Sequence, residues 1–177
     1  MKFVRIDRNK CIRKKVKGLY IEAFPKEERL NFNVLLHKAK GKKADFLAVY
    51  EDDRYVGLVY LIHYEDSVFL FFFAIVPELR GMGYGSKVLR ALRSIFADKK
   101  ITLLIESTSE ECDNLEERLN RKLFYEKNGF VACGYELIEK GVRYDCMSSP
   151  VAVSKESFSE LLKDYWGKVI YKVYYRI

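Results

Sequence analysis

Hydrophobic and polar residues along the chain follow first a helical period and then a strand period. A short apolar segment at residues 2–6 predicts a strand, and apolar residues then recur every three or four positions from Lys10 until Pro25 interrupts them. A second short helix is predicted just before Gly41, which we expect to cap its end. The apolar residues of these two helices are Ile12, Val16, Leu19, Tyr20, Ala23, Phe32, Leu35, Leu36 and Ala39.

The next part of the chain has the pattern of three strands joined by short polar turns. Phe46–Glu51 and Tyr55–His63 flank the turn at residues 52–54, and Val68–Val76 is a continuous apolar run that ends at Pro77. Turns this short cannot hold the helix that a parallel connection needs. The three strands should therefore be antiparallel neighbours.

Helical and strand patterns alternate after Pro77. An amphipathic helix is followed by a strand at Ile101–Ile105, which should lie parallel to the strand before that helix. Asp113 and Glu116 have the spacing of a capping box, so the next helix should begin there and end at Gly129. The expected buried residues of these two helices are Val88, Leu89, Leu92, Ile95, Phe96, Leu115, Leu119, Leu123 and Phe124.

The last segment predicts a hairpin, a helix and a final strand. Phe130–Ile138 and Val142–Met147 flank a turn that contains Gly141. An amphipathic helix then ends at Gly167, and Val169–Ile177 alternates between apolar and polar residues as a strand would.

Length and composition indicate one globular domain. A chain of 177 residues can bury a sizeable core, and no apolar run reaches the roughly 18–20 residues that cross a bilayer. Pro150 marks the boundary between a domain at residues 1–150 and a C-terminal extension at residues 151–177, which we expect to pack on the same domain. The first residues lack the apolar region of a secretion signal, so we expect a cytoplasmic protein without a membrane partner.

The cysteines and histidines argue against a metal centre. The four cysteines are widely spaced with no Cys-x-x-Cys pair, and the chain has two histidines. We therefore expect no metal site, and the thiols should be reduced and mostly buried in the core.

The net charge of +7 is distributed unevenly. Residues 1–43 carry 14 Lys and Arg against 4 Asp and Glu, a net charge of +10, and the remaining residues carry 18 against 21, a net charge of −3. This asymmetry leaves open a binder of nucleic acid or of an acidic protein surface. We favour a solvated basic surface, because no nucleic-acid-binding motif accompanies the charge.

The segment between the apolar run and the amphipathic helix has the composition of a phosphate-binding turn. It reads Arg-Gly-Met-Gly-Tyr-Gly-Ser at residues 80–86. The first turn of a helix has backbone N–H groups without internal partners, and glycines let a pyrophosphate approach them closely. Arg80 adds a permanent positive charge.

Three interpretations of this turn compete. It can be an ordinary glycine-rich turn, since such a motif alone is weak. It can be a dinucleotide site, with Ser86 at the third-glycine position and Glu106 on the ribose. Two features oppose that interpretation: the turn follows antiparallel strands, and residues 77–80 separate strand from glycines.

The third interpretation rests on a resemblance. Residues 73–86 resemble the acetyl-CoA motif of the GNAT superfamily of N-acetyltransferases, in which Arg80, Gly83 and Gly85 occupy the pattern Arg/Gln-x-x-Gly-x-Gly/Ala. Residues 123–130 look like the helix-to-strand junction of the same family. The resemblance implies an α+β fold, an α/β/α sandwich with a mixed, mostly antiparallel sheet of six to seven strands and helices on both faces.

The resemblance also implies which residues hold the cofactor acetyl-CoA. The main chain of the fourth strand would pair with the pantetheine arm, and the amides of the glycine turn would bind the pyrophosphate. Arg118 and Arg121 stand where relatives often have Asn and a small residue, so no pantetheine contact is carried over to them. The expected cofactor-binding residues are Phe73, Ala74, Ile75, Arg80, Gly81, Met82, Gly83, Tyr84, Gly85 and Ser86.

Two further residues are expected to be catalytic by the same resemblance. Tyr125 matches the family tyrosine beside the CoA sulfur, which makes it the candidate general acid, although it could only pack or order the cofactor. Glu106 is the preferred candidate base at the end of a strand. Glu22, His63 and Glu65 are weaker candidates, and a water chain without a side-chain base is also open.

The predicted function is an acetyl-CoA-dependent N-acetyltransferase that modifies a primary amine. A non-catalytic CoA-binding module and a basic binder of nucleic acid or acidic protein are the alternatives. The sequence does not identify the acceptor. It also leaves undecided whether the aromatic residues of the C-terminal segment form a homodimer interface.

Overall fold

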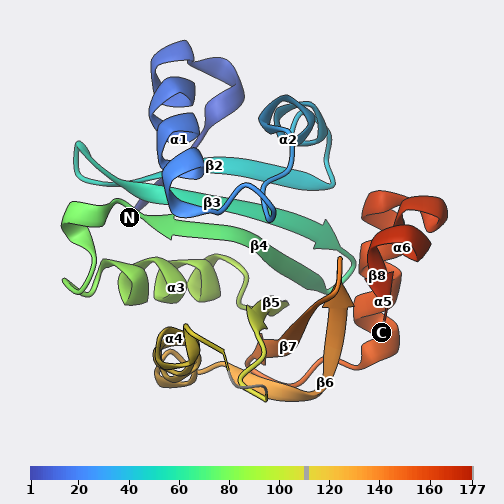
Figure 1. The fold of residues 1–177 in the computed structure, drawn as a ribbon. Coiled ribbons are helices and arrows are strands. Elements are labelled where there is room, and N and C mark those ends of the chain that lie inside the picture. Colours follow the sequence, from blue (N-terminus) through green and yellow to red (C-terminus); the bar gives the residue numbers. More distant parts are fainter. Residues whose placement is uncertain (110–111, 177) are drawn as a thin grey trace. The chain divides into compact units, whose positions relative to one another are not determined.

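The structure, a computed structural model, describes residues 1–109 and 112–176. The chain forms two compact units, one of Met1–His63 with Leu70–Ile95 and one of Tyr64–Phe69 with Phe96–Ile177. The strand β4 (Ser67–Ile75), which is labelled in Figure 1, contributes its first three residues to the second unit and the others to the first.

The first unit begins with a strand and two helices. β1 (Lys2–Arg5) and the 3₁₀ turn η1 (Ile6–Arg8) lead into α1 (Lys10–Ala23), and α2 (Phe32–Lys38) follows. The Asn9 side chain caps α1 by accepting hydrogen bonds from the backbone N–H groups of residues 11 and 12.

Four strands form the sheet of this unit in the order β1-β2-β3-β4. β2 (Ala44–Glu51) pairs antiparallel with β1 on one side and with β3 (Arg54–Tyr64) on the other. The 3₁₀ turn η2 (Pro77–Leu79) and α3 (Tyr84–Ile95) follow β4. The predicted hairpin-connected strands are therefore confirmed.

The core of the first unit explains why β3 is apolar along most of its length. Tyr60 of β3 contacts Phe46 at a ring-centroid distance of 5.1 Å, and α1 adds Tyr20 to the same aromatic cluster. The alternate residues Val59 and Leu61 are equally buried, so both faces of β3 are covered. Strands buried on both faces read as continuous apolar runs.

The second unit is built on a parallel pair and an antiparallel hairpin. Ser67–Phe69 of β4 pair in parallel with β5 (Lys100–Glu106), as the intervening helix predicted. β5 pairs antiparallel with β7 (Val142–Ser149), which forms a hairpin with β6 (Val131–Glu139). Lys140 and Gly141 have φ angles of 49° and 87°, the left-handed values of a tight hairpin turn.

Four more elements complete the second unit. α4 (Leu115–Lys127) precedes β6, and α5 (Lys155–Trp166), α6 (Lys168–Tyr174) and β8 (Tyr175–Arg176) follow β7. Phe158 of α5 packs edge-on against Phe69 at 5.0 Å between ring centroids. The domain boundary at Pro150 stays a prediction.

The predicted fold class, α+β with a mixed and mostly antiparallel sheet, is confirmed. Among the described residues the two-residue strand β8 adds an eighth strand to the six or seven predicted. In those residues we also find no helix that is long and apolar enough to cross a bilayer.

Three predicted helix details are wrong. α2 ends at Lys38 with Ala39 as its C-cap, so Gly41 is not the cap. Ile95 is the last residue of α3, where the helical face ends, and it is 56% exposed. The N-cap of α4 is Asn114, which leaves Asp113 outside a capping box.

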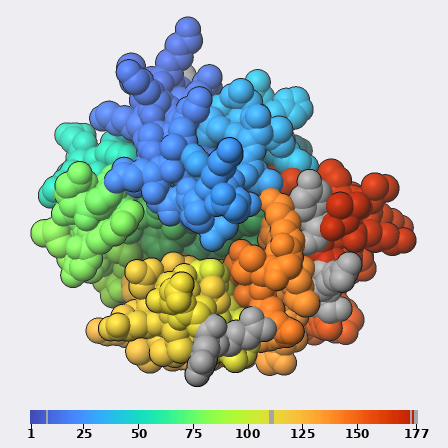
Figure 2. All heavy atoms as spheres, viewed as in Figure 1, coloured from blue at the N-terminus to red at the C-terminus, as the bar shows by residue number. Residues whose placement is uncertain are grey.

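The buried face of α4 also differs from the prediction. Leu119 and Leu123 are 43% and 60% exposed, and the helix, yellow in Figure 2, reaches the surface. Leu115 and Phe124 of the predicted stripe are half-buried, as are Arg118, Lys122 and Tyr125. The helix is turned so that Arg118 faces the end of β5, where it forms an ion pair.

The C-terminal segment is mainly helical. Most of the predicted strand Val169–Ile177 forms α6, and only Tyr175–Arg176 pair with β6, while Ile177 lies outside the described residues. Tyr171 and Tyr175 stack with ring centroids 5.9 Å apart, a contact that the four-residue spacing of a helical turn brings together.

The cysteines are also less buried than we expected. Cys146 is buried, whereas Cys11 is exposed and Cys112 and Cys133 are half-buried. In the part of the chain that the structure describes, no group of side chains suited to a metal ion is found.

Candidate functional site

The predicted pantetheine edge is the C-terminal half of β4. Within the first unit its ladder neighbour is β3, and the backbone of Ala74 approaches Gly57 of that strand very closely. A Cβ atom at residue 57 would lie 2.2 Å from the carbonyl oxygen of Ala74. Sequence reasoning missed Gly57, although a glycine inside an apolar strand signals such an approach.

The glycine turn follows directly in the same unit. Gly81 and Gly83 have φ angles of 74° and 80°, which side-chain-bearing residues rarely adopt. A Cβ atom built on either glycine would meet no heavy atom within 4 Å, so the turn borders open space. The carbonyl of Gly83 accepts the first hydrogen bond of α3, from the N–H of Lys87 at 3.1 Å.

The backbone N–H groups of this turn are available to a ligand. None of the N–H groups of residues 81–86 donates a hydrogen bond to a described residue. Those of residues 84–86 form the first turn of α3, where an α-helix provides no acceptor. The turn therefore presents a row of donors at the positive end of a helix dipole.

Arg80 lies at the junction of strand and turn. Its Nε donates to the carbonyl oxygen of Ile75 at 3.1 Å, and its side chain is exposed. This bond uses one of five guanidinium N–H donors and ties the turn to the end of β4.

A lysine of the first turn of α3 lies beside the glycine turn. Lys87 forms an ion pair with Glu51 at 3.0 Å, and its Nζ lies 4.9 Å from the centre of the Tyr84 ring. The turn therefore has a second cation nearby.

Tyr125 belongs to the second unit, where the end of α4 fixes its position. Gly129 has a φ of 81°, and Phe130 and Gly129 donate backbone hydrogen bonds to the carbonyls of Tyr125 and Glu126 at 3.1 and 2.9 Å. These two bonds define a Schellman motif. The rings of Tyr125 and Phe130 pack 5.6 Å apart, the apolar contact that accompanies this motif.

Burial raises the pKa of the Tyr125 hydroxyl to about 12, while the nearby Arg121 charge lowers it. The phenol therefore stays protonated at physiological pH. No hydrogen bond joins its hydroxyl to a residue that the structure describes, so the group is available as a donor.

Glu106, in the same unit, is engaged in ion pairs. Arg118 donates to one carboxylate oxygen at 3.0 Å and Arg121 to the other at 3.3 Å. Arg118 also donates to the backbone carbonyl of Ser107. Both carboxylate oxygens are thus held by arginines, which favours a structural role for Glu106.

The weaker base candidates are placed as follows. His63 Nε2 lies 2.8 Å from Asp45 Oδ2, which makes it part of a structural cluster in the first unit. Glu65 occupies a turn with a φ of 46° between β3 and β4. Glu22 is exposed on α1.

The basic segment that precedes β2 is largely exposed. Four lysines of α1 are at the surface, and this N-terminal part is blue in Figure 2. None of the four forms an ion pair with a described residue. They are Lys10, Lys14, Lys15 and Lys17.

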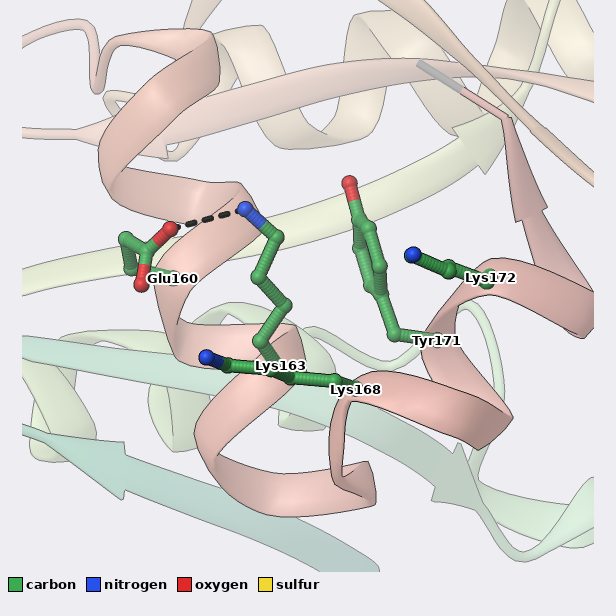
Figure 3. Close-up of a pocket in the computed structure, with 5 residues that line it drawn as sticks. All are labelled: Glu160, Lys163, Lys168, Tyr171 and Lys172. Carbon is green, nitrogen blue, oxygen red and sulfur yellow. Dashed lines mark hydrogen bonds and ion pairs between the residues drawn. The ribbon is translucent and has the colours of Figure 1, made fainter.

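A recess in the second unit is also basic. Its volume is about 310 Å³, and Lys163 pairs with Glu160 at 2.7 Å on one wall (Figure 3). Lys163 Nζ lies 5.2 Å from the centre of the Tyr171 ring. None of the predicted site residues lines this recess.

The part of the chain that contains the predicted site residues matches a known protein family. The sequence model of the acetyltransferase (GNAT) domain matches residues 42–132. No curated protein matches the chain significantly.

Solved structures share the fold. A GNAT-family protein from Bacteroides thetaiotaomicron aligns over 97% of this chain and 98% of its own with a TM-score of 0.78 and 22% identity. An aminoglycoside 6'-N-acetyltransferase complexed with coenzyme A aligns over 84% and 96% with a TM-score of 0.65 and 17% identity. A variant of spermidine N-acetyltransferase from Vibrio cholerae aligns over 84% and 94% with a TM-score of 0.60 and 20% identity.

Proposed function

Because the chain belongs to the GNAT acetyltransferase family, we propose that it transfers the acetyl group of acetyl-CoA to a primary amine. The observation that carries this proposal is the glycine turn, whose N–H groups at residues 81–86 have no protein acceptor among the described residues. A diphosphate fits such a row of donors at a helix N-terminus. The CoA complex of a protein with this fold supports the same ligand.

The pantetheine arm would lie along the free edge of β4. Its amides would exchange hydrogen bonds with the main chain of Phe73, Ala74 and Ile75, as an added strand does. The Ile75 carbonyl already accepts from Arg80, so the arm would use the remaining groups. A backbone N–H of this segment would polarise the thioester oxygen.

Tyr125 would act on the leaving sulfur as a hydrogen-bond donor. With a pKa of about 12, its full ionisation by a thiolate is unfavourable. The thiol pKa is about 8.5, and the difference corresponds to roughly 5 kcal/mol. Donation of a hydrogen bond to the developing thiolate stabilises it without that transfer.

The attacking amine must lose a proton, since an unperturbed alkylamine has a pKa of about 10.4. Protonation of Glu106 would weaken its ion pairs with Arg118 and Arg121, which disfavours it as the base. We therefore favour transfer to water, with Glu106 holding the two arginines.

The acceptor is proposed as a class only. The relatives named above are an aminoglycoside and a spermidine N-acetyltransferase, and both names specify amine acceptors. A panel of polyamines, aminosugars, amino acids and N-terminal peptides, assayed by release of free CoA thiol, would identify the acceptor.

Acetyl-CoA binding tests the turn directly. Gly83→Asp places a carboxylate where the diphosphate would lie, and the open space at this Cβ means that the protein itself is not crowded. We expect binding measured by calorimetry to fall below detection. The melting temperature without ligand should fall by a few degrees, because an aspartate at a φ of 80° costs about 1–2 kcal/mol. The matched control is Gly18→Asp on α1, which also has open space and should bind as the wild type does.

The outcomes separate the candidate functions. Retained affinity in Gly83→Asp would contradict the placement of the diphosphate. Acetyl-CoA binding with no thiol release across the amine panel would favour the CoA-binding module. Absence of binding to the wild type would reject both, and a strongly salt-dependent gel shift would then favour the basic binder.

A further inference from the structure

The hairpin of β6 and β7 places two cysteines opposite one another. Ala132 pairs with Met147 in the antiparallel register, and Cys133 and Cys146 are the next residues on the two strands. Adjacent strands of a sheet lie about 4.7–4.9 Å apart. A disulfide spans Cα separations of about 4.4–6.8 Å, so two cysteines that face one another across adjacent strands are within its range.

The strand is also irregular at this point, which leaves room for side-chain adjustment. The register shifts between Ala132 and Glu136, so that residues 133–135 of β6 lie opposite Cys146 alone. Gly134 has a φ of 81° inside this bulge. A cross-link here would not have to distort a regular ladder.

The two thiols interact with each other and with a small polar cluster. Cys133 and Cys146 share a side-chain hydrogen bond, and the Tyr135 side chain lies beside Cys146. The Cys133 sulfur lies 3.4 Å from the Ser148 hydroxyl, and the backbone N–H of Val153 also interacts with it. This cluster contains the two sulfur atoms that a disulfide would join.

The surroundings shift the pKa values of the two thiols in opposite directions. The hydrogen bond from Cys146 and that from the Val153 N–H lower the pKa of Cys133, while burial raises it. Ser148 donates its only hydroxyl hydrogen to the Val151 carbonyl, so it accepts rather than donates at Cys133 and does not add to this lowering. The hydrogen bond with Cys133 and burial raise the pKa of Cys146.

The two cysteines also differ in their exposure to solvent. Cys133 is half-buried, whereas Cys146 is 1% exposed. An oxidant therefore meets Cys133 first, and the neighbouring thiol is in position to attack the oxidised sulfur.

We propose that Cys133 and Cys146 form a reversible disulfide across β6 and β7 when the protein meets a peroxide. The Cys133 thiolate attacks the O–O bond of hydrogen peroxide, which gives the sulfenic acid and hydroxide. The Cys146 thiol then attacks that sulfur, so the S–S bond forms as water leaves. Two thiols are oxidised and one peroxide is reduced to water.

Oxidation would change the hydrogen bonds of the segment that follows β7. Its residues 151–154 are held by Ser148, by Tyr135, whose hydroxyl donates to the Ser154 carbonyl at 3.4 Å, and by Cys133. A disulfide sulfur is a poor hydrogen-bond acceptor compared with a thiolate, so oxidation removes the partner of the Val153 N–H. Hydrogen exchange at residue 153 should become faster in the oxidised protein.

Peptide mapping of the whole chain tests the proposal. Trypsin cleaves after Lys140 and Arg143, which places the two cysteines in separate peptides, residues 128–140 and 144–155. After peroxide and alkylation without reductant, we expect these two peptides to be joined, with the loss of two hydrogen atoms. Dithiothreitol should separate them.

Variants supply the controls. Cys133→Ser should abolish the joined peptide, and a double Cys11→Ser, Cys112→Ser variant should form it as the wild type does. Cys146→Ala is preferred to Cys146→Ser, because a serine hydroxyl would be buried at this position. The peptide map of the wild type tests the proposal without any variant. Unlinked peptides after peroxide, or cross-links to Cys11 or Cys112 in place of this pair, would overturn the proposal.

Discussion

Gly57 shows how one residue controls the backbone beside the proposed cofactor edge. It is buried in β3, where a Cβ atom would lie 2.2 Å from the Ala74 oxygen and 3.2 Å from the Ile75 Cα. These are backbone atoms, which cannot rotate away as the end of a side chain can. Any larger residue must push β4 outward or break its pairing with β3.

Gly57→Ala should therefore destabilise the protein. Overpacking of this kind costs about 1–3 kcal/mol, so the urea midpoint should fall at unchanged slope. Gly18→Ala on the exposed side of α1 is the matched control, and it should stabilise by up to about 1 kcal/mol through helix propensity. Equal midpoints for the Gly57 variant and the wild type would contradict the close approach.

Tyr125→Phe tests the donor role. The variant keeps the ring contact with Phe130, so the fold and the KM for acetyl-CoA should not change. A hydrogen bond to a charged group is worth about 1.5–3 kcal/mol, so kcat should fall by about 10- to 100-fold. Steady-state assays with the best amine of the panel measure this, and an unchanged kcat would remove Tyr125 from the reaction.

Residues that define turns could be predicted from sequence, and ion-pair partners could not. Gly129, Gly141 and Gly167 end elements where their positions indicated, because left-handed backbone favours glycine whatever surrounds it. The pairing of Glu106 with Arg118 and Arg121 depends on how α4 is rotated about its axis, which no local pattern specifies.

At the scale of elements, α4 is the least regular in its burial. Its exposed leucines occupy the positions of a helical stripe, and the pattern correctly predicted a helix but not the direction it faces. The half-buried side includes Arg118, whose ion pair and hydrogen bonds satisfy its charge. Charged side chains on the inward side mislead a sequence-based assignment, which expects apolar residues there.

Leu123→Gln should thus leave the free energy of unfolding nearly unchanged. The side chain is 60% exposed, and surface substitutions change stability by about 0.5 kcal/mol or less. Leu137→Ala on β6 is the comparison, because that residue is fully buried and its loss should cost about 2–5 kcal/mol. A loss of several kcal/mol in Leu123→Gln would mean that the predicted stripe is buried after all.

The C-terminal helix illustrates the limits of short patterns. Val169 and Val173 suit either a strand or one side of a helix, and both remain more than 70% exposed in α6. Seven residues provide too few repeats to separate a period of 2 from one of 3.6. The hydrogen bond from the Tyr171 N–H to the Gly167 carbonyl begins the helix instead.

At the scale of the whole molecule, a cluster around Asp45 links stability to pH. Asp45 accepts from His63 at 2.8 Å and from Arg5 at 2.6 Å, which joins β1, β2 and β3. The hydrogen bond from His63, followed by the charges of His63 and Arg5, lowers the pKa of this carboxyl. A lowered pKa stabilises the fold above the unfolded value of about 3.9, and that stabilisation is lost as the pH falls below it.

Asp45→Asn should accordingly be less stable than the wild type at neutral pH by about 1 kcal/mol. The difference should shrink as the pH falls below about 4, because there the Asp45 carboxyl of the unfolded chain takes up a proton before that of the folded protein, whose pKa is lower. Chemical denaturation from pH 3 to pH 7 measures it, and Asp53→Asn in the exposed turn is the control. A difference that does not depend on pH would exclude the carboxylate as its source.

The lysines of α1 have a kinetic consequence for any polyanionic ligand of the first unit. This unit carries the segment with a net charge of +10 as well as the glycine turn. A positive field of this kind speeds diffusional encounter, and mobile ions weaken it over about 10 Å at an ionic strength of 0.1 M. Added salt should slow the capture of such a ligand more than it hastens the ligand's escape.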